Sequence, residues 1–317
     1  MMKILITTGI YPPTIGGPAQ YAKNLATAFT ELGHQVMVKT YRLENKLPTG
    51  LRHLYFLLKI LPAVSQSDFV LALDTFSVGL PTVAAGRLLG KKVIIRTGGD
   101  FLWEGYVERT ADLVLLRNFY QTTRDRWSLK ERLIFALTRW TLQHVSKLVF
   151  STDWQRQIWL NPYQLALART TIIENCYGPK QVSRSATQKI FVASSRSLKL
   201  KNHERLLAAF KLAQQRVPDL VLVDESLPYT ELLDNIKTSY AVIIVSVSEV
   251  SPNLALEALN YNKPLILTRE CGLSGLLKNT VLLVDPLDVH GITEKILFLT
   301  RPDNYQQYQQ RSERFIK

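Results

Sequence analysis

The chain has 317 residues, 46% of them hydrophobic, and a formal net charge of +13. This length predicts two domains of ordinary size, each with its own hydrophobic core. Its two cysteines lie in no Cys-x-x-Cys pair, which excludes a disulfide framework and a thiolate metal site and favours a reducing, cytoplasmic setting. We expect neither secretion nor membrane spanning, because the start of the chain has the pattern of a strand and no run of about 18 apolar residues exists.

The first half of the sequence alternates between predicted strands and predicted helices. We expect strands near residues 2–8, 35–40, 69–73, 92–96, 147–151 and 170–174, and helices near 18–33, 50–64, 77–89, 129–145 and 153–160. This alternation predicts an α/β fold with a parallel, doubly wound sheet, whose ligands bind at the carboxyl ends of the strands.

A polar segment, residues 178–188, contains few apolar residues and predicts a linker. A second alternating series follows, with strands near 189–194, 219–223, 240–245, 264–268 and 281–284, and final helices near 288–299 and 303–316. We therefore expect domains at 1–180 and 181–317, with the last helix, 303–317, packing back on the first domain as an alternative.

Two glycines, Gly16 and Gly17, lie between the first predicted strand and the helix that follows it. Glycine allows close approach of the backbone to a ligand, and a helix N-terminus binds anions, so the pair predicts a sugar-phosphate or acceptor loop. The alternative is an ordinary turn after Pro-Pro. The pattern is not Gly-x-Gly-x-x-Gly, and no acidic residue ends the next strand, which disfavours a nicotinamide enzyme.

Acidic and basic residues follow the central strands of both predicted domains. Asp100 and Glu104 come after the strand near 92–96 and predict contacts with an acceptor, although Asp100 after Gly-Gly also fits a helix cap. Arg196 and Lys201 follow the first strand of the second domain and can neutralise a diphosphate. If the register of the motif shifts by two positions, Lys199 takes the role of Lys201. The alternative for these residues is an ordinary basic surface loop.

The most informative motif pairs Glu249 with Glu257, eight positions apart. The apolar run before Glu249 predicts a buried strand, and Glu257 follows a Ser-Pro-Asn helix start, so one carboxylate lies on a loop and the other on a helix. Backbone N–H groups at the start of this helix, Ser251, Asn253 and Leu254, can bind phosphate. The alternative is a solvated glutamate and a charge near a helix N-terminus.

The segment Ser246-Val-Ser-Glu-Val-Ser-Pro-Asn-Leu-Ala-Leu-Glu-Ala-Leu259 resembles the Glu-x7-Glu motif of retaining glycosyltransferases with the GT-B fold, especially glycosyltransferase family 4. Further segments resemble the same family in the required order: Lys3 to Tyr21 with its Gly-Gly loop, Arg96-Thr-Gly-Gly-Asp-Phe-Leu-Trp-Glu104, Ile172-Ile-Glu-Asn175 and Arg196-Ser-Leu-Lys-Leu-Lys201. The resemblance covers nearly the whole chain.

The resemblance implies two Rossmann-like domains that face each other across a cleft, the second one shortened. It implies transfer of a sugar from a nucleotide diphosphate sugar to an acceptor hydroxyl with retention of configuration, the acceptor being a glycan or lipid-linked precursor of a cell-surface polysaccharide. In this interpretation Glu249 binds the donor sugar, Glu257 binds the ribose, and Arg196 and Lys201 bind the diphosphate. Asp100 and Glu104 lie on the acceptor side. The remaining donor-side residues are Gly16, Gly17, Ser251, Asn253 and Leu254. The sequence has no Asp-x-Asp, so we expect neither a metal nor another cofactor.

One departure from the family concerns the donor side of the second domain. Relatives have another strand–helix–strand unit between the strands near 219–223 and 240–245, whereas residues 224–236 suffice for one helix. The nucleotide therefore cannot be transferred from relatives. A catalytically weak or inactive GT-B binding or scaffold protein, with a reduced donor pocket, is the alternative.

The positive charge is concentrated in the first half, with +9 in residues 1–150, where 19 Lys and Arg face 10 Asp and Glu, and +4 in the remainder. Basic residues mixed with aromatic and aliphatic ones suit an anionic membrane surface, and Gly50 to Pro62 predicts an interfacial helix. An ordinary amphipathic helix packed on the sheet is the alternative. Nucleic acid ranks lower, because no recognition motif accompanies the charge. We expect a cytoplasmic protein, with peripheral binding to the inner membrane face as an alternative.

Overall fold

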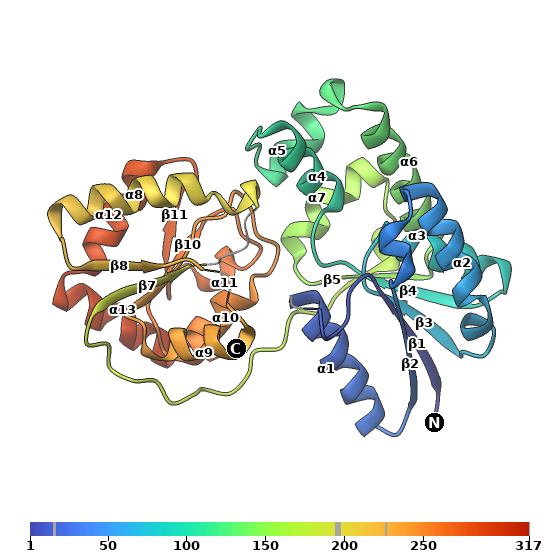
Figure 1. Ribbon diagram of the computed structural model, residues 1–317, viewed down its shortest axis with the longest axis horizontal. Coiled ribbons are helices and arrows are strands. Elements are labelled where there is room, and N and C mark those ends of the chain that lie inside the picture. The colour runs from blue at the N-terminus through green and yellow to red at the C-terminus, as the bar shows by residue number, and fades with distance from the viewer. Residues whose placement is uncertain (15–16, 194–197, 226, 317) are drawn as a thin grey trace. The chain divides into compact units, whose positions relative to one another are not determined.

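The computed structural model describes residues 1–14, 17–193, 198–225 and 227–316. The chain forms two compact units, the first from Met1–Trp103 and Thr123–Glu174, the second from Glu104–Thr122 and Asn175–Lys317 (Figure 1). A short segment from the first half of the chain, Glu104–Thr122, therefore belongs to the second unit. The domain boundary at residue 180 stays a prediction.

A parallel six-stranded sheet is the core of the first unit, in the order β2-β1-β3-β4-β5-β6. Its strands are β1 (Lys3–Thr8), β2 (Gln35–Thr40), β3 (Phe69–Ala72), β4 (Lys92–Arg96), β5 (Lys147–Phe150) and β6 (Thr170–Ile172). Ile4, Leu5 and Ile6 of β1 are almost completely buried, as expected for a central parallel strand covered on both faces. The predicted strands of the first half are confirmed.

Helices connect these strands. They are α1 (Gly17–Glu31), α2 (Thr49–Ser65), α3 (Gly79–Leu88), α6 (Leu129–His144) and α7 (Asp153–Tyr163), while α4 (Phe101–Thr110) begins in the first unit and ends in the second. Ser128 and Glu131 form a capping box at the start of α6. At the start of α3, a Cβ on Gly79 would lie 2.3 Å from the carbonyl oxygen of Asp74, so this position requires glycine.

The second unit contains a smaller parallel sheet of five strands, in the order β11-β10-β9-β7-β8. Its strands are β7 (Lys189–Ala193), β8 (Leu220–Val223), β9 (Ala241–Ile244), β10 (Leu265–Thr268) and β11 (Leu282–Val284). Its helices are α5 (Leu116–Thr122), α8 (His203–Arg216), α9 (Tyr229–Thr238), α10 (Asn253–Asn260), α11 (Ser274–Leu277), α12 (Val289–Leu299) and α13 (Pro302–Arg314). The predicted strands and the single helix predicted between β8 and β9 are confirmed, whereas no bounds were predicted for α4, α5, α8 and α11.

The second sheet separates two hydrophobic cores. Ile243 of β9 packs with residues of α8 and α12 on one face. Its neighbours Val242 and Ile244 pack with residues of α9 and α10 on the other face. Alternate side chains of one strand thus contribute to opposite cores, which is the doubly wound arrangement expected from the sequence.

The predicted linker is held against the second unit. Gln181 N donates to Asn260 O (2.8 Å), and Lys180 Nζ donates to Leu259 O (2.7 Å). Helix α13 belongs to the same unit, because the ring of Tyr305 stacks on that of Tyr240 with centroids 4.1 Å apart. Packing of the last helix on the first domain stays a prediction.

Candidate functional site

The loop that carries Glu249 is attached to the neighbouring loop of the second sheet. Glu249 lies between β9 and α10, and Glu257 lies on α10, as predicted. Glu249 N donates to Glu270 O (2.8 Å), and Gly272 N donates to Glu249 O (2.9 Å). These bonds join the loops that follow β9 and β10, so the backbone of Glu249 is fixed at the carboxyl edge of the sheet.

The carboxylate of Glu249 forms an ion pair with Lys201, through Oε1 and Nζ. Lys201 ends the turn Lys199–Lys201 that follows β7, and β7 is the neighbour of β9 in the sheet. The side chain of Lys201 is only 8% exposed, and that of Glu249 is 15% exposed. Two residues that the sequence placed in separate motifs are thus in contact, and each compensates the charge of the other in a poorly solvated position.

The structure also distinguishes Lys201 from Lys199. Lys199 Nζ donates to the backbone oxygen of Glu108 (3.0 Å), and Leu200 N donates to the Glu108 carboxylate (3.3 Å). Lys201, and not Lys199, therefore contacts Glu249. Arg196 and Gly16 lie outside the described residues.

The start of α10 offers backbone donors next to this pair. Its N-cap residue is Pro252, which has no side-chain oxygen to accept from the first turn. The N–H groups of Asn253 and Leu254 belong to that turn, where a helix provides no acceptor of its own. Ser251 Oγ is buried without a hydrogen-bond partner among the described residues. Asn175 Nδ2 donates to Asn253 Oδ1 (2.9 Å) and thereby holds the helix start.

Glu257 accepts a hydrogen bond from Tyr229 Oη (2.9 Å). Burial raises the pKa of the Glu257 carboxyl, and the bond from Tyr229 opposes this increase. Tyr229 is the first residue of α9, the helix between β8 and β9. A phenol from α9 and a carboxylate from α10 therefore lie together, and both can hydrogen-bond to hydroxyl groups.

The segment Glu104–Thr122 contacts the same edge of the second sheet. Arg117 forms a bidentate ion pair with Glu270, with Nε 2.5 Å from Oε2. Leu116 N donates to Ser248 Oγ (3.0 Å). Burial raises the pKa of Glu270, whereas Arg117 opposes the increase. Because Glu270 also accepts from Glu249 N, Arg117 stabilises the loop that holds Glu249.

The predicted residues of the first unit have structural partners. Asp100 is buried and accepts from Trp103 N (3.0 Å) and from Trp159 Nε1 (2.8 Å). These bonds make it the cap of α4, which was the alternative considered for it, and its acceptor role stays a prediction. Gly17 begins α1, as expected. Glu104 lies on α4 in the part that belongs to the second unit.

Comparison with known proteins identifies the fold. No protein-family model matches the sequence, and a comparison with curated proteins gives no match. Solved structures match almost the whole chain. Sucrose-phosphate synthase from Thermosynechococcus elongatus aligns with a TM-score of 0.74 at 12% identity over 99% of this chain and 94% of that one. The chain has the GT-B fold.

Two further GT-B structures give similar values. HepE of Anabaena in complex with UDP-glucose aligns with a TM-score of 0.66 at 13% identity, over 98% of this chain and 93% of that one. WaaG, a glycosyltransferase involved in lipopolysaccharide biosynthesis, aligns with a TM-score of 0.68 at 15% identity, over 98% of this chain and 94% of that one.

Sequence reasoning missed two residues of the second GT-B unit and one of the first. Tyr229 and Arg117 contact Glu257 and Glu270, but each comes from an element that carries no motif. In the first unit, Asp74 follows β3 and accepts from Val78 N (2.9 Å) and Gly79 N (3.1 Å), while burial raises its pKa. An acidic residue directly after an apolar strand was the available signal for Asp74.

We expect Tyr229→Phe to weaken nucleotide binding about threefold to tenfold, because it removes the phenol hydroxyl and leaves Glu257 without this bond. The ring is half-exposed, so the melting temperature should change little. Calorimetric titration with the nucleotide that binds the wild-type protein measures the effect. Tyr308→Phe, on α13, is the matched control, and equal affinities of the two variants would contradict the assignment.

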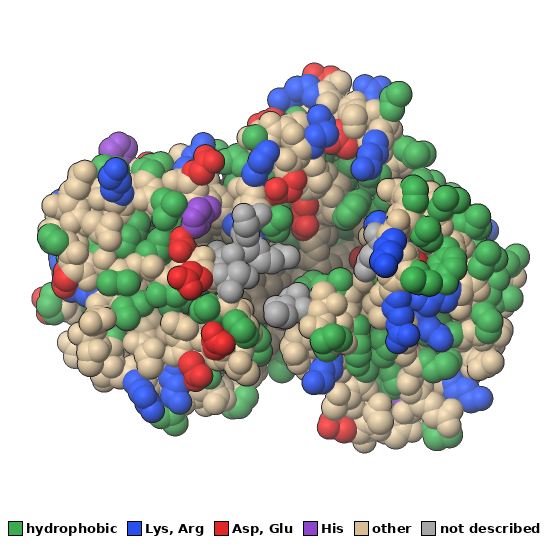
Figure 2. Space-filling model, viewed as in Figure 1, with side chains coloured by type: hydrophobic (Ala, Val, Ile, Leu, Met, Phe, Trp, Pro, Cys, Tyr) green, Lys and Arg blue, Asp and Glu red, His purple; other side chains and the backbone are tan. Residues whose placement is uncertain are grey.

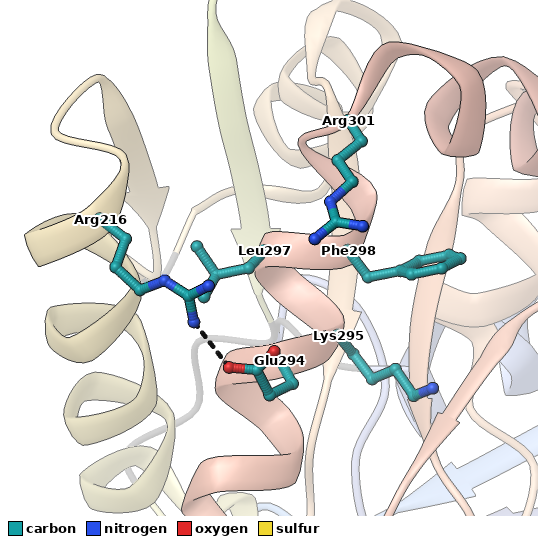
Figure 3. Close-up of a pocket in the computed structure, with 6 residues that line it drawn as sticks. All are labelled: Arg216, Glu294, Lys295, Leu297, Phe298 and Arg301. Carbon is teal, nitrogen blue, oxygen red and sulfur yellow. Dashed lines mark hydrogen bonds and ion pairs between the residues drawn. The ribbon is translucent and has the colours of Figure 1, made fainter.

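A cavity of about 250 Å³ lies elsewhere on the second unit, at α12 and the end of α8. It is lined by Arg216, Glu294, Lys295, Leu297, Phe298 and Arg301 (Figure 3). Arg216 Nη1 donates to Glu294 Oε1 (2.7 Å) across it. None of the predicted site residues that the structure describes lines this cavity. Within the described residues, no group of three His, Cys, Asp or Glu side chains could hold a metal ion.

Proposed function

We propose that this GT-B protein is a retaining glycosyltransferase that moves a sugar from a nucleotide diphosphate sugar to an acceptor hydroxyl without a metal ion. The observation that supports the proposal best is the Lys201–Glu249 ion pair, which joins two motifs at the carboxyl edge of the second sheet. Ligands of open α/β sheets bind at this edge. The hydrogen bond between Glu257 and Tyr229 adds a second polar group on the helix that follows.

In this proposal the diphosphate of the donor binds Lys201, Arg196 and the N–H groups at the start of α10. Phosphate groups bind helix N-termini and basic side chains. When the bond between sugar and phosphate breaks, negative charge develops on the leaving diphosphate, and these fixed donors stabilise it. On donor binding, before this bond breaks, Lys201 exchanges its contact with Glu249 for one with phosphate, which leaves the Glu249 carboxylate to accept hydrogen bonds from sugar hydroxyls.

The acceptor in this proposal is a glycan or lipid-linked precursor of a cell-surface polysaccharide, with Asp100 and Glu104 on the acceptor side. The leaving phosphate takes the proton from the acceptor hydroxyl, which attacks from the same face of the sugar, so configuration is retained. HepE has been solved with UDP and with UDP-glucose, and WaaG is described as acting in lipopolysaccharide biosynthesis. UDP-glucose is therefore the first donor to test.

The test is thermal unfolding of the protein with UDP, GDP, dTDP, ADP and CMP and the corresponding sugars, first without metal and then with magnesium. A ligand at 100 times its Kd stabilises the folded state by about 2.7 kcal/mol, which raises Tm by about 5 °C or more for a protein of this size. We expect one nucleotide class to give this shift. Glu257→Gln should reduce it, whereas Glu294→Gln, an exposed glutamate of the same unit, should not.

A non-catalytic GT-B binding protein is the second candidate, because the described residues between β8 and β9 form a single helix, α9. Release of free nucleotide from the donor that binds, in the presence of a glycan or lipid-linked acceptor, separates the two. Binding without turnover would favour the non-catalytic candidate. Absence of any thermal shift would contradict the transferase and would also favour the non-catalytic candidate.

A further inference from the structure

Helix α2 carries two apolar faces, although packing in its own unit needs only one. Phe56, Ile60, Ala63 and Val64 are buried against the unit. Leu51, Leu54, Tyr55 and Leu58 are 58%, 53%, 42% and 59% exposed. The spacing of the exposed residues, i, i+3, i+4 and i+7, places them on one side of the helix. We call these four residues the outer face of α2.

The charged residues of α2 and its immediate flanks, residues 45–67, are all basic. Residues 45–67 contain Lys46, Arg52 and Lys59 and no Asp or Glu. The nearest acidic residue before them, Glu44, is completely buried and is neutralised by Lys59 Nζ at 2.6 Å. No carboxylate within α2 therefore offsets the basic groups, and the exposed Asp68, three residues beyond the helix, accepts from Lys3 N (2.7 Å).

The end of the neighbouring helix α3 adds a second exposed cluster of the same composition. Leu88 and Leu89 are exposed there, next to Arg87 and Lys92, which are also exposed. Lys91 Nζ donates to Ser67 O (2.8 Å), a bond that holds this loop beside the end of α2. Figure 2 shows hydrophobic side chains gathered over α2 with Lys and Arg side chains beside them.

We propose that the outer face of α2 binds the surface of an anionic membrane. The leucines enter the boundary between headgroups and acyl chains, with the helix parallel to the membrane plane, and Lys46, Arg87 and Lys92 contact lipid phosphates. Among the described residues, no helix is long and apolar enough to cross a bilayer. The face is thus suited to lying on the membrane.

Charge also decides against the other apolar partner that is always present, a second copy of the chain. A symmetric contact through α2 would bring the outer face, and its basic residues, against the same residues of the partner copy. Like charges would then meet across the interface with no acidic residue of α2 to offset them. An anionic lipid surface provides the opposite charge together with an apolar layer.

The experiment is flotation of the full chain with phosphatidylcholine vesicles, with and without 30% phosphatidylglycerol, at low and at high salt. We expect partition into the anionic vesicles only, and weaker partition at high salt. The double variant Leu54→Gln with Leu58→Gln should weaken partition into anionic vesicles about tenfold or more. The double variant Lys46→Gln with Arg87→Gln should weaken this partition about fivefold for each charge removed. The matched control, Leu129→Gln with Leu133→Gln on α6, changes two exposed leucines of the same unit and should float like the wild type.

Several results would overturn the proposal. These are absence of flotation, equal flotation with neutral vesicles, and equal flotation of the α2 variant and the α6 control. A lipid-free dimer that the α2 variant abolishes, measured by light scattering, would assign the face to self-association instead. The proposal does not rest on the donor site, since Glu249→Gln should float like the wild type.

Discussion

Glu249→Gln is expected to lower kcat/KM for sugar transfer by about 100-fold or more while the protein remains folded. The change removes the negative charge that contacts Lys201, and it replaces one of the two acceptor oxygens proposed to orient the donor sugar with an NH2 donor. Loss of a single preorganised group at a reacting centre typically costs a factor of about 100 to 1,000 in rate. Initial rates with the donor identified by thermal shift measure the effect, and circular dichroism verifies the fold.

Changing both residues of the Lys201–Glu249 ion pair tests the role of Glu249 more specifically. Lys201→Met should weaken binding of the diphosphate as well as catalysis, and the double variant should lose much less than the product of the two single losses, because the side chains act together. Glu294→Gln, whose glutamate pairs with Arg216 at the surface, is the control and should keep full activity. Multiplicative losses in the double variant would show that Glu249 and Lys201 act independently.

Arg117→Met should lower the free energy of unfolding by about 2 to 3 kcal/mol. Glu270 is buried, and without Arg117 its carboxylate loses the counter-charge shown in the structure. Removing one partner of a buried ion pair costs about 3 to 5 kcal/mol, and the loss is smaller here because Arg117 is half-exposed. Chemical denaturation at pH 7 measures the change.

The pH dependence distinguishes this cause from lost packing. Burial raises the pKa of Glu270 above its unfolded value even with Arg117 present, and removal of Arg117 raises it further. The destabilisation should therefore be absent at pH values below the folded pKa of Glu270 in the wild type, and should grow as the pH rises from that pKa to the higher folded pKa of the variant. The double variant Arg117→Met with Glu270→Gln should regain most of the unfolding free energy that Arg117→Met loses. Arg216→Met, at an exposed pair, should change stability little at any pH.

The sheets could be predicted from the sequence because their strands are buried on both faces. Ala241–Ile244 and Leu265–Thr268 are apolar runs in which every residue is buried, and such runs allow few other assignments. Helix α4 could not be predicted in this way, since Gly105 and several aromatic residues give it a low helix propensity. It forms because Leu102, Trp103, Tyr106 and Val107 are buried, and burial in the tertiary structure outweighs propensity.

The candidate site shows the same division between local and distant information. The spacing of Glu249 and Glu257 identified the loop and the helix that carry them. The residues that contact these motifs could not be found by spacing, because Tyr229 is 28 positions from Glu257 and Arg117 is 153 positions from Glu270. Only the folded chain brings such pairs together, and their own surroundings in the sequence contain no motif.

The membership of Glu104–Thr122 in the second unit limits how this protein can exchange parts with others. The chain passes between the units at residues 103–104, 122–123 and 174–175, so no single crossover separates them. A chimera joined at the linker would combine the second unit with a foreign counterpart of this segment, and Glu270 would be neutralised only if that counterpart carried a cation at the right position. Recombination that keeps the second unit intact must therefore transfer Glu104–Thr122 from the first half of the chain together with the second half.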